Sequence, residues 1–256
     1  MLLYEKTSAG AIQLVGVEYI VFKAAWERDH GVGAAPPEIR SGLCAYDLSE
    51  AGVDRKAHWE SVYATKRSTE MSWYQQQPAR SLEFLAQTGL APDGAIIDVG
   101  GGDSTLVDTL VERRFGRVTV LDISGAALAR ARARLGSRAG EVTWLEADVT
   151  RAELGPQAYD FWHDRAVFHF LTDAEDRRAY VDQVRRSVKL GGHVLVATFA
   201  EDAPARCSGL PVVRYSADSL HSEFGPEFHM LTSEREDHRT PGGTAQPFLY
   251  CLCRRE

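Results

Sequence analysis

The segment that decides the fold is Ile97-Asp-Val-Gly-Gly-Gly-Asp-Ser104, in which a short apolar run ends in an acid and three consecutive glycines. The run Ala95-Ile-Ile-Asp-Val99 is typical of a buried strand, and residues 104–115 carry apolar side chains at helical spacing. Glycines between a strand and a helix let the backbone turn sharply and approach a ligand without a Cβ in the way. The segment therefore predicts a ligand-binding turn at the carboxyl end of a strand.

Strands and helices alternate on both sides of this turn. We expect further strands at residues 117–121, 142–145, 159–162 and 193–198, and helices at 58–64, 78–89, 125–135 and from 172 to about 190. Residues 228–232 and 247–253 have the pattern of a final pair of strands joined through a Pro-Gly-Gly turn. This order predicts an α/β fold with a doubly wound, mostly parallel sheet and an antiparallel C-terminal edge.

The composition limits the classes of protein that remain possible. The chain has 256 residues, 44% of them hydrophobic, and 29 Lys and Arg against 36 Asp and Glu give a formal net charge of −7. An acidic chain of this kind is a poor general nucleic-acid binder, because phosphate contacts need clustered basic residues. The length fits one large domain with an appendage. The regular pattern predicts an N-terminal extension of unknown role over residues 1–56 and one α/β domain over residues 57–256.

Membrane and export signals are weak in this sequence. The most apolar early stretch, residues 11–25, is interrupted by Glu18 and Lys23 and is too short to span a bilayer. The first residues lack a basic segment ahead of an apolar core, which disfavours a signal peptide. The four cysteines, at positions 44, 207, 251 and 253, fit neither a disulfide framework nor a zinc site. We expect a cytoplasmic protein without a membrane partner or a metal site.

A second acid, Asp122, ends the next predicted strand, 20 residues after Gly102. A carboxylate at that position can accept hydrogen bonds from both hydroxyls of a ribose, so the pair of features predicts a nucleoside cofactor. A dinucleotide fingerprint would need glycine where Thr105 stands, and Asp98 would face a diphosphate unfavourably. The same Asp98 suits a cationic amino-acid cofactor.

The sequence resembles the class I S-adenosylmethionine (SAM)-dependent methyltransferases over about residues 57–254. Asp98-Val-Gly-Gly-Gly102 is similar to the first motif of that family, and Asp122 is similar to its ribose-binding acid. Ala147-Asp-Val149 resembles the segment after the third strand, and His163-Asp-Arg165 lies where the family has substrate-side residues at the end of the fourth strand. The resemblance implies a Rossmann-like sheet of seven strands and SAM as the cofactor.

The resemblance also implies roles for individual residues. Asp148 would bond the adenine amino group, and the backbone of Val149 would meet the adenine ring. The implied cofactor contacts on the sheet are Asp98, Gly100, Gly101, Gly102, Asp122, Ile123, Asp148 and Val149.

A narrower resemblance rests on aromatic residues. His58-Trp59, Trp73-Tyr74 and Trp162-His-Asp-Arg-Ala166 are similar to a subgroup that includes thiopurine S-methyltransferase and tellurite-resistance methyltransferases. It implies that Trp59, Trp73 and Tyr74 cover the cofactor and that Cys207-Ser-Gly-Leu-Pro211 lies on the substrate side. A related pattern occurs in some protein-lysine methyltransferases, so the acceptor stays open.

Methyl transfer needs little acid–base chemistry when the acceptor is a thiolate, because the protein mainly aligns the reacting atoms. A hydroxyl or amine acceptor would benefit from a base, for which His163, Asp164 and His169 are the candidates. Arg165 would bind an anionic acceptor or hold Asp164. We predict methyl transfer to a small molecule, with a thiol or another soft nucleophile favoured. The alternatives are a protein-lysine methyltransferase, a non-catalytic SAM-binding or partner-binding protein, and, more remotely, a nucleotide-dependent oxidoreductase.

Overall fold

The computed structural model describes residues 2–6, 12–17 and 54–256, and the chain divides into two compact units, Met1–Val53 and Asp54–Glu256. In the first unit, strands β1 (Leu2–Lys6) and β2 (Ile12–Val17) pair antiparallel, with a register irregularity between Leu3 and Tyr4. Most of the predicted N-terminal extension, Cys44 included, lies outside the described residues.

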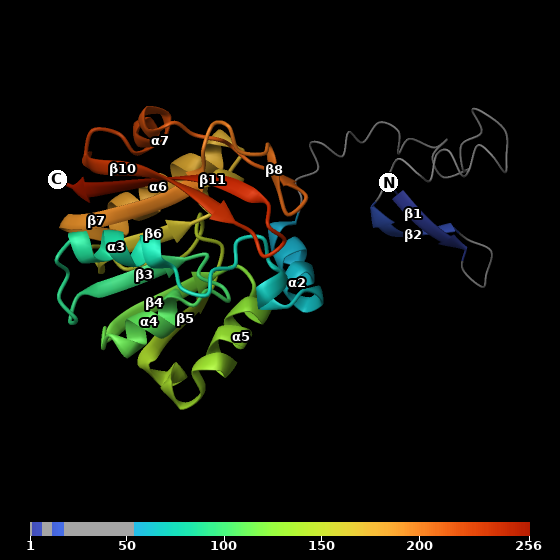
Figure 1. Cartoon of the computed structure of the whole chain (residues 1–256), viewed down its shortest axis with the longest axis horizontal. Helices are drawn as coiled ribbons and strands as arrows, with labels where there is room; N and C mark the ends of the chain where they lie inside the picture. The colour runs from blue at the N-terminus through green and yellow to red at the C-terminus, as the bar shows by residue number, and fades with distance from the viewer. Residues whose placement is uncertain (1, 7–11, 18–53) are drawn as a thin grey trace. The chain divides into compact units, whose positions relative to one another are not determined.

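The second unit is built on a seven-stranded sheet in the order β10-β11-β7-β6-β3-β4-β5 (Figure 1). The five strands from β7 to β5 run parallel, whereas β11 is antiparallel to β7 and β10 is antiparallel to β11. The predicted mostly parallel sheet with an antiparallel C-terminal edge is therefore confirmed. The strands are β3 (Ala95–Val99), β4 (Arg117–Asp122), β5 (Val142–Glu146), β6 (Tyr159–Arg165), β7 (Val188–Phe199), β10 (Phe228–Arg239) and β11 (Ala245–Arg255).

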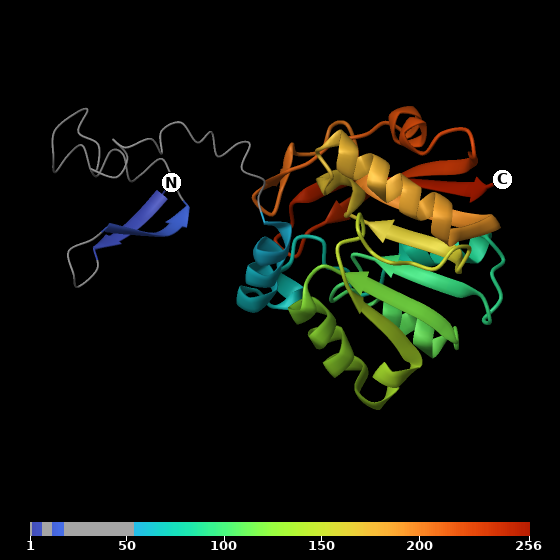
Figure 2. The ribbon, with the colours of Figure 1, turned by 180° about the vertical axis from the view of Figure 1, so that it is seen from behind.

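Helices cover both faces of this sheet, as the two opposite views show (Figures 1 and 2). Side chains alternate along a strand, so Ile97 and Val99 of β3 join one hydrophobic core and Ile96 joins the other. The core of Ile97 packs against α6 and α7, and that of Ile96 packs against α3 and α4. The helices are α2 (Arg55–Thr65), α3 (Ala79–Gln87), α4 (Leu106–Glu112), α5 (Gly125–Leu135), α6 (Ala174–Ser187) and α7 (Ala217–Phe224).

Several boundaries differ from those predicted; strand β10, for example, continues to Arg239 instead of ending at Thr232. The strand expected at 159–162 continues to Arg165, because its last residues pair with β3 and β7 on either side. The helix expected to reach residue 190 ends at Ser187, since Val188 takes an extended conformation and pairs with Tyr159 as the first residue of β7. Its N-cap is Asp173. Helix α7 and the short hairpin of β8 (Arg206–Cys207) and β9 (Leu210–Pro211) were not predicted.

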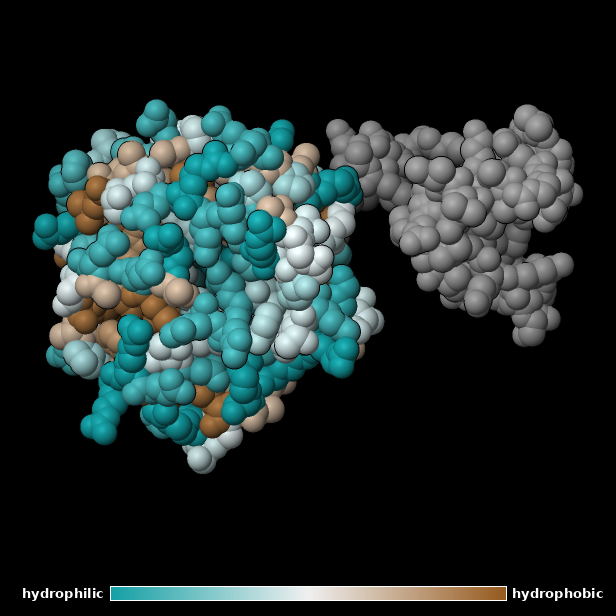
Figure 3. All heavy atoms as spheres, viewed as in Figure 1, coloured by the Kyte–Doolittle hydropathy of each residue, from teal (hydrophilic) through white to brown (hydrophobic). Residues whose placement is uncertain are grey.

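The surface seen in the view of Figure 1 is mostly hydrophilic, and its apolar side chains lie in scattered patches (Figure 3). Within the described part of the chain, no helix has the length and apolar character that crossing a membrane requires.

Candidate functional site

The glycine turn after β3 can be built only from glycine. Gly100 and Gly102 have φ of +63° and +45°, a backbone region that L side chains rarely adopt. A Cβ at Gly100 would overlap Cγ2 of Val167, and one at Gly102 would lie 2.7 Å from the Tyr63 hydroxyl oxygen and 2.9 Å from Asp122 Oδ2. The glycines therefore let the turn pack against two neighbouring segments at once.

A cavity of about 850 Å³, counting its open mouth, lies at the carboxyl ends of the parallel strands. The carboxyl edge is where α/β sheets bind ligands. Most of the predicted site residues line it, namely Trp59, Trp73, Gly100, Asp122, Ile123, Asp148, Val149 and Arg165. We call this space the main cavity.

A second cavity of about 580 Å³ shares Tyr63, Trp73, Gly100 and Arg165 with the main cavity. We call it the side cavity. It brings in four more of the predicted residues, which are Asp98, Gly101, Tyr74 and His163. Gly102 and Asp164, which were also predicted, line neither space.

Two carboxylates of the main cavity lie at neighbouring strand ends. Asp122, the last residue of β4, accepts a hydrogen bond from the Ser124 backbone N–H at 2.8 Å. Burial raises its pKa to about 7, and the nearby Asp98 and Glu60 carboxylates add to the shift. Asp148, beyond the end of β5, accepts from the backbone N–H and the hydroxyl of Thr150 at 2.9 and 2.7 Å. The cavity thus offers two acceptor groups to a neutral or cationic ligand.

Asp98 is held by a chain of buried polar groups. Its Oδ1 lies 2.7 Å from His163 Nδ1, and His163 Nε2 lies 2.9 Å from the Ser81 hydroxyl. The pattern is satisfied when His163 carries its proton on Nδ1 and accepts from Ser81 on Nε2. The other oxygen, Oδ2, is buried without a hydrogen-bond partner among the described residues. A buried carboxylate oxygen without a donor is costly, so it marks a place for a cationic or N–H group of a ligand.

The expected substrate-side role of Asp164 does not fit its surroundings. The side chain is fully buried and accepts three hydrogen bonds, from the backbone N–H groups of Val167 and Phe168 and from the Tyr180 hydroxyl. Burial raises its pKa to about 6. These contacts fix the turn that carries Val167 against the glycine loop, so Asp164 shapes the site from behind.

His169 likewise lies outside both cavities. Its Nδ1 accepts from the Phe199 backbone N–H at 3.1 Å, and burial lowers its pKa to about 3. His169 is therefore a neutral residue of the interior. Of the three candidate bases, only His163 reaches a cavity, and both of its ring nitrogens already have partners.

Arg165 lies where the two cavities meet. Its Nε donates to the Tyr250 hydroxyl at 2.9 Å, its Nη1 donates to the Trp73 carbonyl at 3.1 Å, and its guanidinium carbon lies 4.4 Å from the centre of the Phe248 ring. Its Nη2 is buried and has no hydrogen-bond partner among the described residues. Stacking and two hydrogen bonds fix the guanidinium, and one edge remains available.

Helix α2 closes one side of the main cavity. Arg55 pairs with Asp176 at 2.9 Å and with Asp148 at 3.5 Å, which ties the start of the helix to the sheet domain. Glu60 accepts from the backbone N–H of Gly125, at the N-terminus of α5, at 2.7 Å. The ring of Trp59 packs edge-on against those of Trp73 and Phe170, with centroids 5.6 and 5.1 Å apart. The predicted aromatics thus belong to one wall of the site.

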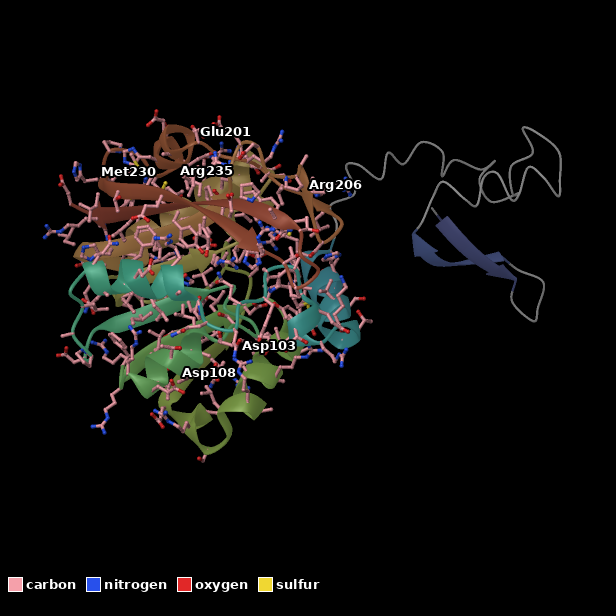
Figure 4. All side chains as sticks on the ribbon, viewed as in Figure 1. Asp103, Asp108, Glu201, Arg206, Met230 and Arg235 are labelled. Carbon is pink, nitrogen blue, oxygen red and sulfur yellow. The ribbon has the colours of Figure 1, made fainter. Side chains whose placement is uncertain are left out.

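An acid directly after the glycines, Asp103, is occupied by structural contacts. It pairs with Arg134 of α5, whose Nε also donates to Asp108 at 2.9 Å (Figure 4). Asp103 also accepts from the Ser68 hydroxyl. This network joins the glycine turn, α4 and α5, and so supports the turn, while Asp103 also lines the side cavity.

Several site residues could not be found from local sequence patterns. Ser81 lies in the middle of an amphipathic helix, and Tyr63 reads as a core aromatic. Gln246 and Phe248 reach the main cavity from β11, almost 150 residues after the glycine turn. Their alternate spacing predicts only that they share a face of a strand.

The comparisons with known proteins agree with this architecture. Residues 97–194 match the methyltransferase domain family. An uncharacterized methyltransferase of Mycobacterium tuberculosis is 34% identical over 115 residues, which are 45% of this chain and 54% of that protein. The chain therefore spans about half the length of the mycobacterial relatives that it matches. The eEF1A lysine and N-terminal methyltransferase of Danio rerio is 19% identical over 199 residues, 77% of this chain and 27% of that protein.

Among solved structures, the N-methyltransferase NodS of Bradyrhizobium japonicum WM9, in complex with S-adenosyl-L-homocysteine (SAH), has a TM-score of 0.62 at 15% identity. The match covers 79% of this chain and 99% of that chain. The fold is thus the Rossmann-like fold of the class I methyltransferases, as the sequence predicted. The narrower resemblance to the thiopurine and tellurite-resistance subgroup stays a prediction.

Proposed function

We propose that this protein is a methyltransferase that moves a methyl group from SAM to a small acceptor, with a thiol or another soft nucleophile favoured. The observation that carries the proposal is the convergence of three acids on the glycine turn. Asp122 and Asp148 line the main cavity beside Gly100, and Asp98 lines the adjoining side cavity with a free oxygen. An adenosine that bears an amino-acid cation matches this arrangement of acceptors.

The residues present fit that cofactor. Asp122 would accept from the ribose hydroxyls, Asp148 would accept from the adenine amino group, and the backbone of Val149 would lie against the ring. Asp98 Oδ2, which lacks a donor, would accept from the ammonium group of the methionine part. Gly100, Gly101, Ile123, Trp59, Trp73 and Tyr74 would complete the enclosure. When bound, SAM supplies a methyl group that is already activated on a sulfonium.

The favoured acceptor follows from the side chains that line the main cavity. Asp164 and His169 lie outside it, and both nitrogens of His163 are engaged. Among the residues of the main cavity that we do not assign to the cofactor are the apolar Phe170, Leu171 and Phe248. A nucleophile that needs no base at neutral pH, such as a thiolate, fits a site of this kind better than a hydroxyl does.

A protein-lysine acceptor is the alternative, and the similarity to the zebrafish lysine and N-terminal methyltransferase favours it. The discriminating experiment is transfer of a labelled methyl group from SAM to a panel of thiols and amines and to cell extract. Label confined to small thiols supports the proposal. A labelled protein band would support the lysine alternative, and no transfer at all would support a non-catalytic SAM-binding protein.

The cofactor is tested separately by calorimetry with SAH and with NAD. Binding of SAH alone supports the proposal, whereas binding of NAD alone would overturn it. We further propose that the predicted N-terminal extension is not needed by the site, except for its last residues, because Arg55 and Lys56 belong to helix α2 and Arg55 lines the main cavity. Deletion of residues 1–50 should then leave the SAH affinity within twofold of that of the whole chain.

A further inference from the structure

The guanidinium of Arg165 is held in place entirely by neutral groups. Its hydrogen-bond partners are a hydroxyl and a carbonyl, and its face rests on the Phe248 ring. The nearest negative charge in this network is Glu236, which accepts from the Tyr250 hydroxyl at 2.8 Å and so lies one hydroxyl away. A partly buried cation without a directly bonded anion is unfavourable until a ligand supplies one.

The available edge of this guanidinium belongs to the cavities. Arg165 lines both of them, and its Nη2 is buried without a partner among the described residues. Gln246 also lines the main cavity, and its Oε1 is a second buried polar atom without a partner. Two residues of one cavity thus each keep a polar atom without a partner, which a polar group of a ligand would satisfy.

The surrounding side chains are flat and apolar. Trp59, Trp73, Phe170 and Phe248 line the main cavity together with Leu171. Aromatic walls of this kind favour a planar ligand, which can stack on one ring and meet the edge of another. The acids of the cavity, Asp122 and Asp148, are the residues that we assign to the cofactor. They are therefore already bonded when the acceptor's anionic group binds beside Arg165.

We infer that the methyl acceptor is a planar, mostly apolar molecule with an anionic group such as a carboxylate, and that the Nη2 edge of Arg165 binds that group. The inference rests on the proposed function, because it assigns the acceptor half of the same site. Arg165 acts here as a specificity-determining residue: it positions the acceptor and takes no proton. Bidentate or end-on binding of a carboxylate is the use for which a fixed guanidinium is best suited.

The test uses the full-length protein saturated with SAH and two probes of nearly the same shape, one anionic and one neutral. Fluorine NMR titrations give the Kd values of 4-fluorobenzoate and of its neutral amide, 4-fluorobenzamide. We expect the wild-type protein to bind the benzoate at least about tenfold more tightly, which corresponds to about 1.4 kcal/mol. Arg165→Met should bring the two Kd values within about twofold, and Arg165→Lys should keep part of the preference.

Arg132→Met is the matched control, because Arg132 also stacks on an aromatic ring, that of Trp144 at 5.4 Å, but is exposed and lines neither cavity. This variant should keep the full preference for the benzoate. The comparison of benzoate and benzamide binding in the wild-type protein needs no substitution. It therefore tests the anionic acceptor even if Arg165→Met does not fold.

The outcomes separate the two proposals. Equal Kd values for the two probes in the SAH-bound wild type, or no binding of either, would overturn the anionic acceptor and leave the cofactor untouched. If Arg165→Met loses SAH affinity tenfold while the benzoate preference persists, Arg165 binds the carboxylate of the cofactor and the inference is wrong. If the wild type does not bind SAH, the proposed function fails. The two probes, titrated without SAH, then still test the anion site.

Discussion

The residues that line the main cavity can be divided into an acidic half and an acceptor half, which differ in charge and in the parts of the chain that supply them. One half presents the carboxylates of Asp122 and Asp148, which follow successive parallel strands. The other half presents the guanidinium of Arg165 with the rings of Phe170 and Phe248, which come from two parts of the chain, the end of β6 with the segment after it, and strand β11. Under our proposals, the carboxylates of the first half bind the cationic cofactor and Arg165 of the second half binds an anionic acceptor.

The largest effect on stability and on cofactor binding should come from a substitution in the glycine turn, at Gly100. Gly100→Val would put a branched Cβ into Val167 and force a residue with φ of +63° into a strained conformation. We expect a loss of about 2–4 kcal/mol in the free energy of unfolding and no measurable SAH binding. Thermal unfolding and calorimetry would measure the two effects.

Gly116→Ala is the control for this substitution. A Cβ at Gly116 meets no atom within 4 Å, and its φ is outside the left-handed region. The control should keep wild-type stability within about 0.5 kcal/mol and full SAH affinity. Normal SAH binding by a folded Gly100→Val variant would show that the turn does not contact the cofactor.

Asp122 tests the acidic half. Asp122→Asn keeps an oxygen that accepts from the Ser124 N–H. It loses the carboxylate charge, which we propose strengthens the hydrogen bonds from both ribose hydroxyls. Loss of a charged hydrogen bond of this kind should weaken SAH binding more than tenfold at pH 8, by about 1.5–3 kcal/mol. Calorimetry measures this change. An unchanged Kd would remove Asp122 from the cofactor site.

The pH dependence of binding follows from the raised pKa of Asp122, about 7 in the ligand-free protein. Because ribose hydroxyls bond the ionised carboxylate, binding lowers this pKa and releases a proton near neutral pH. The SAH affinity should therefore fall by about tenfold between pH 8 and pH 6 in the wild type. Asp122→Asn should show a flat profile over this range, and an equal slope in both proteins would contradict the assignment.

The raised pKa of Asp122 also determines how the stability of the ligand-free protein changes with pH. An acid whose pKa is raised on folding contributes most below its unfolded value, near 3.8, and that contribution is lost as the pH rises to about 7. The ligand-free Asp122→Asn protein should therefore gain in melting temperature relative to the wild type from pH 4 to pH 7 and then level off. The substitution Asp122→Asn would thus weaken SAH binding and stabilise the ligand-free protein.

The acidic half was largely predictable from sequence, because its parts are local. The glycine turn, Asp122 and Asp148 each follow a short apolar strand directly, so the strand pattern also places them at one edge of the sheet. The order of elements then predicts the parallel sheet and its antiparallel edge. The same reasoning misjudged Val188, whose burial is compatible with helical spacing, because backbone pairing with Tyr159 decides its conformation.

The acceptor half was not predictable in the same way. Phe248 meets Arg165, and Gln246 lines the same cavity, only because β11 folds back beside β7. A sequence pattern does not report which side chains then share a cavity. Asp164 illustrates the opposite error. Its place beside Arg165 indicated a role at the substrate, whereas alternation along β6 turns it into the core, where Tyr180 binds it.

The smallest effects that we predict concern the proposed binding site of the cofactor's ammonium group, which a comparison of SAH with adenosine distinguishes from the nucleoside site. His163 and Asp98 pair at 2.7 Å, which holds Asp98 with Oδ2 free, so His163→Leu should loosen that carboxylate. We expect about a fivefold loss of SAH affinity and no change for adenosine, which lacks the ammonium group. Ser81→Ala, which removes only the contact at 2.9 Å beyond His163, should weaken SAH binding about twofold. Because adenosine tests the same fold and the same nucleoside pocket, equal losses for both ligands would mean that His163 supports the structure generally. A loss confined to SAH would instead assign the Ser81–His163–Asp98 chain to positioning the carboxylate that meets the cofactor's cation.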